Sequence, residues 1–143
     1  MRTDGMKRRR IRAGAALLLG GLLCAAAAPA PVRIEVRNEA GAPLQCQVLA
    51  SHWYAQPARD VPPGGTFRVS LLFDATTGAV LDDAQRRLPL ETLFCGRAGE
   101  AWRTRSDLHL GELVAAAAGK GVARVVCRAA ADRLDCRTPA ASR

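Results

Sequence analysis

The side chains that could bind a metal ion are spread thinly along this chain. Cys46, His52, Tyr54 and His109 carry donor atoms, and copper or zinc binds sulfur and nitrogen donors of this kind. Cys46 and His52 share one strand-like run, where six residues of extended chain separate them by about 20 Å. One coordination sphere cannot span that distance, so a copper or zinc site would need ligands from other strands. Metal handling is therefore an alternative function, and we predict no bound cofactor.

A hydrolase would use His52 as its general base, together with a serine nucleophile and an orienting aspartate. The candidate nucleophiles are Ser51, Ser70 and Ser106. The chain has no Gly-x-Ser-x-Gly motif, which marks the nucleophile of many hydrolases. Neighbouring residues of a strand point to opposite faces, so Ser51 and His52 would not be partners. A small hydrolase is a second alternative, and we expect no catalytic residue.

Four cysteines beyond the N-terminal segment favour structural disulfide bonds over redox chemistry. No two of them are separated by only two residues, the spacing that a thioredoxin-like site requires. A hairpin centred on residues 131–132 would place Cys127 opposite Cys136, which leaves Cys46 to pair with Cys95. The chain-entropy model gives about 3 kcal/mol of stabilisation for the shorter loop and about 4 kcal/mol for the longer one.

Aromatic residues beside a proline-rich segment are the best candidates for a binding surface. Trp53 and Tyr54 run into residues 55–65, which contain three of the eight prolines. Tryptophan and tyrosine are common anchors of interfaces, and rigid anchors lose little entropy on binding. The alternative is that Trp53 and Trp102 only pack across a sheet. We predict a binding surface that includes His52, Trp53, Tyr54, Trp102 and residues 55–65.

Alternating apolar residues predict the strands that position these groups. Residues 32–38 and 44–54 each place apolar side chains on one face, as half-buried strands do. Between them, Gly41 and Pro43 favour a turn, so we expect the two strands to form an antiparallel pair. The inward face of the second strand is predicted to carry Leu44, Cys46, Val48, Ala50, His52 and Tyr54.

The rest of the chain predicts short strands and one helix. Pro89 favours an edge position for its strand. Ser106 or Asp107 could cap a helix that Gly119 ends, and residues 108–110 fit an extended segment equally well. Further strands are predicted at residues 66–73, 79–81, 88–95, 122–128 and 133–137. Together these features predict a mainly β fold, a small antiparallel β-sandwich-like domain with one short helix before a C-terminal hairpin closed by a disulfide.

The first 27 residues have the pattern of a secretory signal peptide. A basic run at residues 7–12 precedes an apolar stretch at residues 13–28, and small residues predict cleavage before Ala28. The stretch is shorter than the roughly 20 residues of a membrane span. Leu23 does not provide the small residue that lipidation of Cys24 would require. We therefore predict one exported β-domain over residues 28–143, ordered over about 32–137, without a stable membrane anchor, in the periplasm or secreted, by either the general or the twin-arginine route.

The charge distribution argues against a nucleic-acid partner. The formal charge of +8 divides into +5 for residues 1–27, with six basic and one acidic residue, and +3 for residues 28–143, with fifteen and twelve. Nucleic-acid-binding domains usually cluster their Lys and Arg residues, and the exported part has one lysine, Lys120. We predict a non-catalytic periplasmic binding or accessory protein whose partner is another periplasmic or envelope protein. In architecture alone it resembles small exported β-sandwich proteins, and a fold does not indicate a function.

Overall fold

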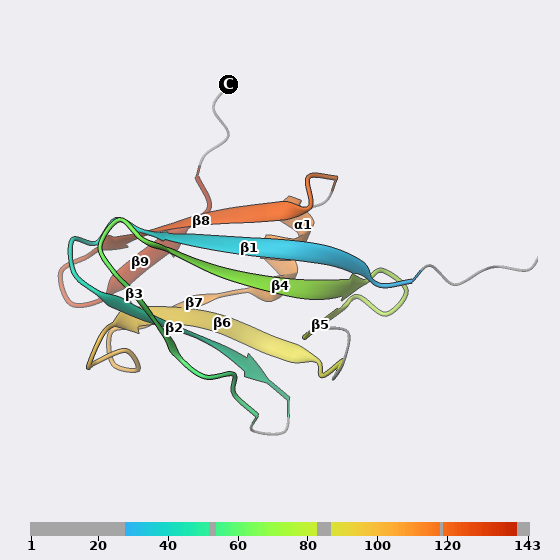
Figure 1. Ribbon diagram of the computed structural model, residues 1–143, viewed down its shortest axis with the longest axis horizontal. Helices are drawn as coiled ribbons and strands as arrows, with labels where there is room; N and C mark the ends of the chain where they lie inside the picture. Colours follow the sequence, from blue (N-terminus) through green and yellow to red (C-terminus); the bar gives the residue numbers. More distant parts are fainter. Residues whose placement is uncertain (1–27, 52–53, 83–86, 118, 140–143) are drawn as a thin grey trace, which may run out of the picture.

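The computed structural model describes residues 28–51, 54–82, 87–117 and 119–139, so the predicted signal peptide lies outside these ranges. The described residues form nine strands and one helix, arranged as two facing sheets with the helix against both (Figure 1). The elements are β1 (Ala30–Asn38), β2 (Leu44–Ala50), β3 (Arg59–Val61), β4 (Thr66–Asp74), β5 (Ala79–Leu81), β6 (Leu90–Arg97), β7 (Ser106–Leu108), α1 (Leu110–Ala117), β8 (Val122–Ala129) and β9 (Leu134–Arg137).

The two sheets confirm the predicted fold class. One sheet has five strands in the order β5-β4-β1-β8-β9, and the other has four in the order β3-β2-β6-β7. Strand pairing is antiparallel except between β1 and β8, which run parallel. The fold is therefore mainly β, with one short helix before a C-terminal hairpin that a disulfide closes.

The alternating pattern of the strands builds one core between the sheets. Ile34 and Val36 of β1 point inward and are almost fully buried, as are Leu44 and Val48 of β2. The inward face predicted for β2 is confirmed from Leu44 through Ala50, whose burial alternates residue by residue. His52 lies outside the described residues. Because each strand buries one face and exposes the other, the two sheets pack face to face.

The predicted antiparallel pair of the first two long strands is wrong. β1 lies between β4 and β8 in the five-stranded sheet, whereas β2 lies between β3 and β6 in the other. Residues 39–43 therefore carry the chain from one sheet to the other. A strand has only two hydrogen-bonding edges, and β4 and β8 already occupy both edges of β1.

Three local expectations also need correction. The strand after Pro89 is not an edge strand, because β6 begins at Leu90 and pairs with β2 on one side and β7 on the other. Pro89 precedes it and makes an isolated bridge with Leu81, and its carbonyl accepts a hydrogen bond from the Ser51 amide at 2.9 Å. Residues 55–65 are not all loop, since they contain β3. The chain stays extended through β7, so the helix begins at Leu110 rather than next to Ser106.

The helix α1 closes one side of the sandwich. Its buried residues join the common core, and it contacts strands of both sheets, including β1, β6 and β8. As predicted, it ends before Gly119, whose φ of 74° suits glycine. The amides of Lys120 and Gly121 both donate to the Ala117 carbonyl at 2.9 Å. In the described part of the chain, no helix is long and apolar enough to cross a membrane.

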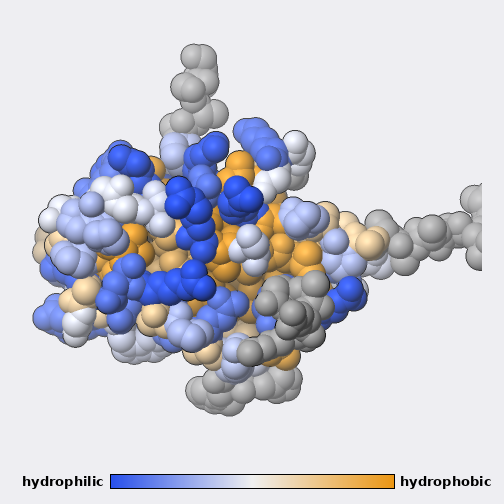
Figure 2. All heavy atoms as spheres, viewed as in Figure 1, coloured by the Kyte–Doolittle hydropathy of each residue, from blue (hydrophilic) through white to orange (hydrophobic). Residues whose placement is uncertain are grey.

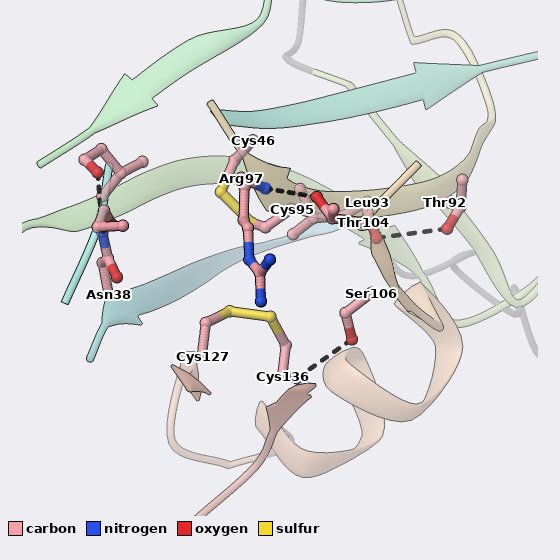
Figure 3. The surroundings of a disulfide bond; sticks show 12 residues. Asn38, Cys46, Thr92, Leu93, Cys95, Arg97, Thr104, Ser106, Cys127 and Cys136 are labelled. Carbon is pink, nitrogen blue, oxygen red and sulfur yellow. Dashed lines mark hydrogen bonds between the residues drawn. A yellow bond between two sulfur atoms is a disulfide. The ribbon is translucent and has the colours of Figure 1, made fainter. Parts of the chain in front are cut away.

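Both predicted disulfide bonds are confirmed. Cys46 is bonded to Cys95 across β2 and β6, and Cys127 is bonded to Cys136 across β8 and β9. The hairpin register also agrees, since Ala129 pairs with Leu134. Figure 3 shows the two bonds at the same end of the sandwich, one on each sheet. Each bond therefore cross-links two neighbouring strands of its sheet on the side that faces the core.

Asn38 joins the loops at the end of β1. Its side chain is fully buried, and its Nδ2 donates to the carbonyls of Ala42 and Val61, both at 2.9 Å. Its Oδ1 accepts a hydrogen bond from the Ala40 amide at 2.9 Å. The Asn38 amide donates to the Gly65 carbonyl, also at 2.9 Å. A buried amide with these partners satisfies the requirement that buried polar groups be paired, so Asn38 holds the crossing between the sheets.

Candidate functional site

Trp102 is the large hydrophobic side chain that the described residues leave exposed, at 62% of its full area. Its ring meets that of Phe94 edge to face, with centroids 5.5 Å apart and an interplanar angle of 84°. Phe94 is only 3% exposed, yet it lies outside the sandwich core, between the core residues Leu93 and Cys95. Trp102 therefore covers an aromatic ring on the outer face of β6 that water would otherwise reach.

The segment that carries Trp102 folds back against β6 at Gly96. A Cβ atom on Gly96 would overlap the backbone of Ala101, chiefly its carbonyl oxygen. Glycine permits this approach because it has no side chain. Gly96 follows Phe94 by two residues and so lies on the same face of the strand. The contact at Gly96 thus brings the neighbouring Trp102 over Phe94.

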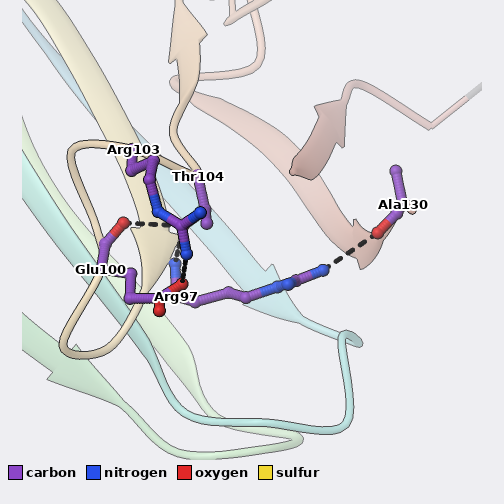
Figure 4. A network of polar contacts seen from close by, with 5 residues as sticks. All are labelled: Arg97, Glu100, Arg103, Thr104 and Ala130. Atoms are coloured by element: carbon purple, nitrogen blue, oxygen red, sulfur yellow. Dashed lines mark hydrogen bonds and ion pairs between the residues drawn. The ribbon is translucent and has the colours of Figure 1, made fainter. Parts of the chain in front are cut away.

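A hydrogen-bonded turn holds this segment in place (Figure 4). The Thr104 hydroxyl is buried, accepts a hydrogen bond from the Arg97 amide at 2.8 Å and donates to the Glu100 carbonyl at 3.0 Å. The amides of Arg103 and Thr104 also donate to that carbonyl, at 3.0 and 3.1 Å. An ion pair of 2.7 Å joins Arg103 Nη2 to Glu100 Oε2. Trp102 therefore sits on a turn whose backbone is largely paired.

The same turn is attached to the opposite sheet. Arg97 Nη2 donates to the Ala130 carbonyl at 3.0 Å, and the Leu134 amide donates to the Thr104 carbonyl at 2.9 Å. In Figure 3 the Arg97 side chain extends from the disulfide of one sheet toward that of the other. Ala130 and Leu134 belong to the C-terminal hairpin region. The position of Trp102 consequently depends on both sheets.

Arg105 places its positively charged guanidinium over the Trp102 ring. Its Cζ lies 4.2 Å from the centre of the Trp102 ring system, and its Nη1 donates to the Trp102 carbonyl at 3.1 Å. Asp107 orients the same guanidinium through a contact of 3.2 Å between Nε and Oδ2. A cation over an indole ring contributes about 0.5 to 1 kcal/mol at an exposed site. Trp102 and Arg105 therefore form one rigid apolar and cationic unit.

Polar side chains extend this unit across the outer face of the four-stranded sheet. Gln47 pairs with Phe94, and its Nε2 donates to the Gln56 carbonyl at 3.0 Å. Gln45 Nε2 donates to Asp60 Oδ1 at 3.2 Å. Predicted segment 55–65 thus borders the same face as Trp102. We call this surface the Trp102 face, and it consists of Gln45, Gln47, Phe94, Trp102, Arg105 and Asp107.

The other residues of the predicted binding surface have different positions. Tyr54 is partly buried and packs against the core, and its carbonyl accepts a hydrogen bond from the Ala50 amide at 2.8 Å. Tyr54 therefore lies at the end of β2, whereas Trp102 lies over Phe94, whose partner is Gln47. His52 and Trp53, which were also predicted to belong to this surface, lie outside the described residues.

Among the described residues, those proposed for metal binding or hydrolysis are dispersed, and His52 lies outside the described ranges. Cys46 is in a disulfide, and His109 is exposed beside α1. Within the described ranges, no group of three or more His, Cys, Asp or Glu residues could hold a metal ion. Ser70 is exposed on β4, whereas the Ser106 hydroxyl accepts a hydrogen bond from the Cys136 amide at 3.1 Å. Ser51 follows β2 in the other sheet from Ser70.

A shallow hollow of 380 Å³ lies between α1 and the end of β9. Asp107, His109 and Glu112 line it together with Cys136 and Arg137. The cysteine is in a disulfide, and the residues that line the hollow include no serine. A histidine and two carboxylates are thus present there, but none of the serines considered as nucleophile for the alternative hydrolase function.

No protein-family model, curated protein or solved structure matches this chain. The predicted surface included Trp102, but sequence reasoning missed its support by Phe94, Gly96, Thr104 and Arg105. The alternation of β6 contained a signal, since Leu93 and Cys95 point into the core and Phe94 must point out. A large aromatic side chain on the outer face of a sheet indicates that another part of the chain covers it.

Proposed function

We propose that the protein is a non-catalytic, exported binding or accessory protein of the periplasm, and that the Trp102 face contacts its partner. The observation that carries this proposal is a tryptophan 62% exposed on a turn whose backbone is largely hydrogen-bonded. Its turn is hydrogen-bonded to both sheets, and Arg105 stacks on its ring. A side chain that is already ordered loses little conformational entropy when a partner covers it.

The composition of the face favours another protein of the cell envelope as the partner. Tryptophan and arginine are the residues most enriched among those that dominate binding energy at protein interfaces. The surrounding glutamines and Asp107 offer donors and acceptors for a polar rim. Both disulfides support the periplasmic location, because such bonds persist in oxidising compartments.

Changing Trp102 to alanine is expected to weaken binding of the envelope partner by about 30-fold, the effect of losing a hot-spot residue worth roughly 2 kcal/mol. The partner would be isolated from a periplasmic extract with the purified protein and identified, and its dissociation constant would then be measured by titration. Trp102→Phe should lose less than Trp102→Ala, because phenylalanine keeps an aromatic ring over Phe94.

Leu72→Ala is a matched control for this experiment. Leu72 is a half-exposed apolar residue of β4 in the other sheet, next to the inward-facing Leu71. Its replacement should leave the affinity unchanged. If Trp102→Ala folds with both disulfides and binds every isolated partner as tightly as the unchanged protein, then the proposed surface is wrong.

Export is expected to remove residues 1–27, because the basic run, the short apolar stretch and the small residues occur in the order of a signal peptide. N-terminal sequencing of the protein recovered from the periplasm should therefore begin at Ala28. Recovery of the protein only in the membrane fraction, with its first 27 residues retained, would contradict this prediction.

A further inference from the structure

The outer side of the five-stranded sheet carries arginines from four adjacent strands. They alternate with buried residues, so their side chains point away from the core. The arginine side chains that form ion pairs remain 58% to 80% exposed. We call this surface the arginine face, and its basic residues are Arg33, Arg37, Arg68, Arg124, Arg128 and Arg137.

The strand register places the acidic residues of this face between arginines. Glu35 pairs with Arg68 on β4 and Arg124 on β8, and each guanidinium lies 3.5 Å from the carboxylate. Glu39 similarly contacts Arg37 at 3.4 Å and Arg128 at 2.9 Å. Each carboxylate thus meets two arginines, which leaves an excess of positive charge on both sides of it.

This face holds the positive charge of the described domain. Its six arginines and four acids (Glu35, Glu39, Asp74 and Asp135) give 6 − 4 = +2. The described residues as a whole have thirteen basic and eleven acidic side chains, so those outside the face have seven of each and no net charge. The strands bring together arginines that are scattered along the chain. In Figure 2 strongly hydrophilic residues lie across the top of the view, over β1 and β8.

We propose that the arginine face docks reversibly onto an anionic phospholipid surface through the lipid phosphates. One guanidinium group can donate two parallel hydrogen bonds to two oxygens of the same phosphate. Neighbouring strands lie about 4.8 Å apart and alternate residues about 6.7 Å apart, so the arginines form a two-dimensional array that faces a plane of headgroups. A hollow of 330 Å³, lined by Glu35, Arg37, Arg68 and Arg124 among others, gives a phosphate room between them.

The chemistry of the face favours a lipid surface over an acidic protein. Protein interfaces depend on aromatic and apolar anchors at their centre. The arginine face has no aromatic residue among its described members, and its apolar side chains, such as Val122 and Val126, are half-buried. The exposed tryptophan lies on the other sheet, so docking would leave the Trp102 face accessible. The proposal is therefore independent of the function proposed for that face.

Vesicle sedimentation tests the proposal, with a protein that begins at Ala28. This form retains every described strand and the helix and lacks the basic residues 2–12, which would bind anionic lipid by themselves. It should bind vesicles of phosphatidylcholine mixed with phosphatidylglycerol and not vesicles of phosphatidylcholine alone. Binding should weaken as salt rises, because counterions screen exposed charges. Arg68→Gln with Arg124→Gln should lower the partition coefficient about 25-fold, or roughly fivefold for each arginine.

A matched pair of substitutions separates the face from the net charge. Arg59→Gln with Arg103→Gln removes the same charge from exposed positions on β3 and on the turn between β6 and β7, away from the face, and should have a much smaller effect. A second test pair, Arg33→Gln with Arg137→Gln, leaves Glu35 and its partners intact, so a loss of binding there cannot come from unpairing Glu35. Equal losses in the test and control pairs, or no binding to anionic vesicles, would overturn the proposal. Capture of an acidic protein without vesicle binding would overturn it too.

Discussion

Replacing Cys46 and Cys95 together with alanine is expected to lower the free energy of unfolding by about 4 kcal/mol. The bond closes a loop with a sequence separation of 49 and joins the two central strands of the four-stranded sheet. Without it, the unfolded chain gains the conformations that the cross-link excludes. Both cysteines are fully buried, so the smaller side chains also leave unfilled core volume. Urea unfolding of the oxidised protein and the double variant measures the difference.

The second disulfide is the internal control for this result. Cys127 and Cys136 close a loop with a sequence separation of only 9, so their replacement by alanine should cost about 3 kcal/mol. They also lie on paired strands of a hairpin whose hydrogen bonds remain. If removal of the hairpin disulfide lowers the free energy of unfolding more than removal of the long-range disulfide, then loop entropy does not determine which bond stabilises the fold more.

Asn38→Asp is expected to destabilise the fold by about 3 to 5 kcal/mol at neutral pH, the range observed when a buried charge lacks its partner. The carboxylate would face the carbonyl oxygens of Ala42 and Val61, which now accept hydrogen bonds from Nδ2. Protonation restores one donor, and in the folded state this surrounding raises the pKa of the new carboxyl. The deficit should therefore shrink as the pH falls toward about 4, the pKa of an unfolded aspartate. Urea unfolding at several pH values measures it.

Asn38→Ala distinguishes the charge from the lost hydrogen bonds. It leaves the same two carbonyls without their side-chain donor but adds no charge, so it should cost about 2 kcal/mol with little dependence on pH. If Asn38→Asp is no less stable than Asn38→Ala at neutral pH, then the prediction that a buried charge at this position destabilises the fold is wrong.

Local patterns predicted much of this fold. The strand register of the β8–β9 hairpin could be predicted from the sequence because its cysteines lie only nine residues apart. The partner of β1 could not be predicted in the same way. Each of the two strands has one apolar face, formed by Val32 and Ile34 in β1 and by Leu44 and Val48 in β2. Two such strands can pair edge to edge in one sheet or pack face to face in two sheets. Here they pack face to face, and the turn-like sequence between them serves either arrangement.

The candidate surfaces show the same division between local and long-range information. The exposed Trp102 was part of the predicted surface, because its residue type alone suggests an anchor. The residues that support Trp102 could not be predicted, because the backbone contact at Gly96 and the stacking of Arg105 depend on how the turn folds back. Alternation likewise predicts that Arg68 and Arg124 point outward. Only the pairing of their strands with β1 brings them to one carboxylate, that of Glu35.

The parallel pairing of β1 with β8 has a consequence for the order in which the molecule can fold. Arg33 pairs with Val122, and Asn38 with Cys127, so one edge of the first strand stays open until residues 122–127 have been synthesised. Closing so long a loop is entropically costly and slows folding. A chain that emerges N-terminus first therefore cannot complete its larger sheet until β8 and β9 have left the ribosome. Such delayed completion is compatible with transport of an unfolded chain across a membrane.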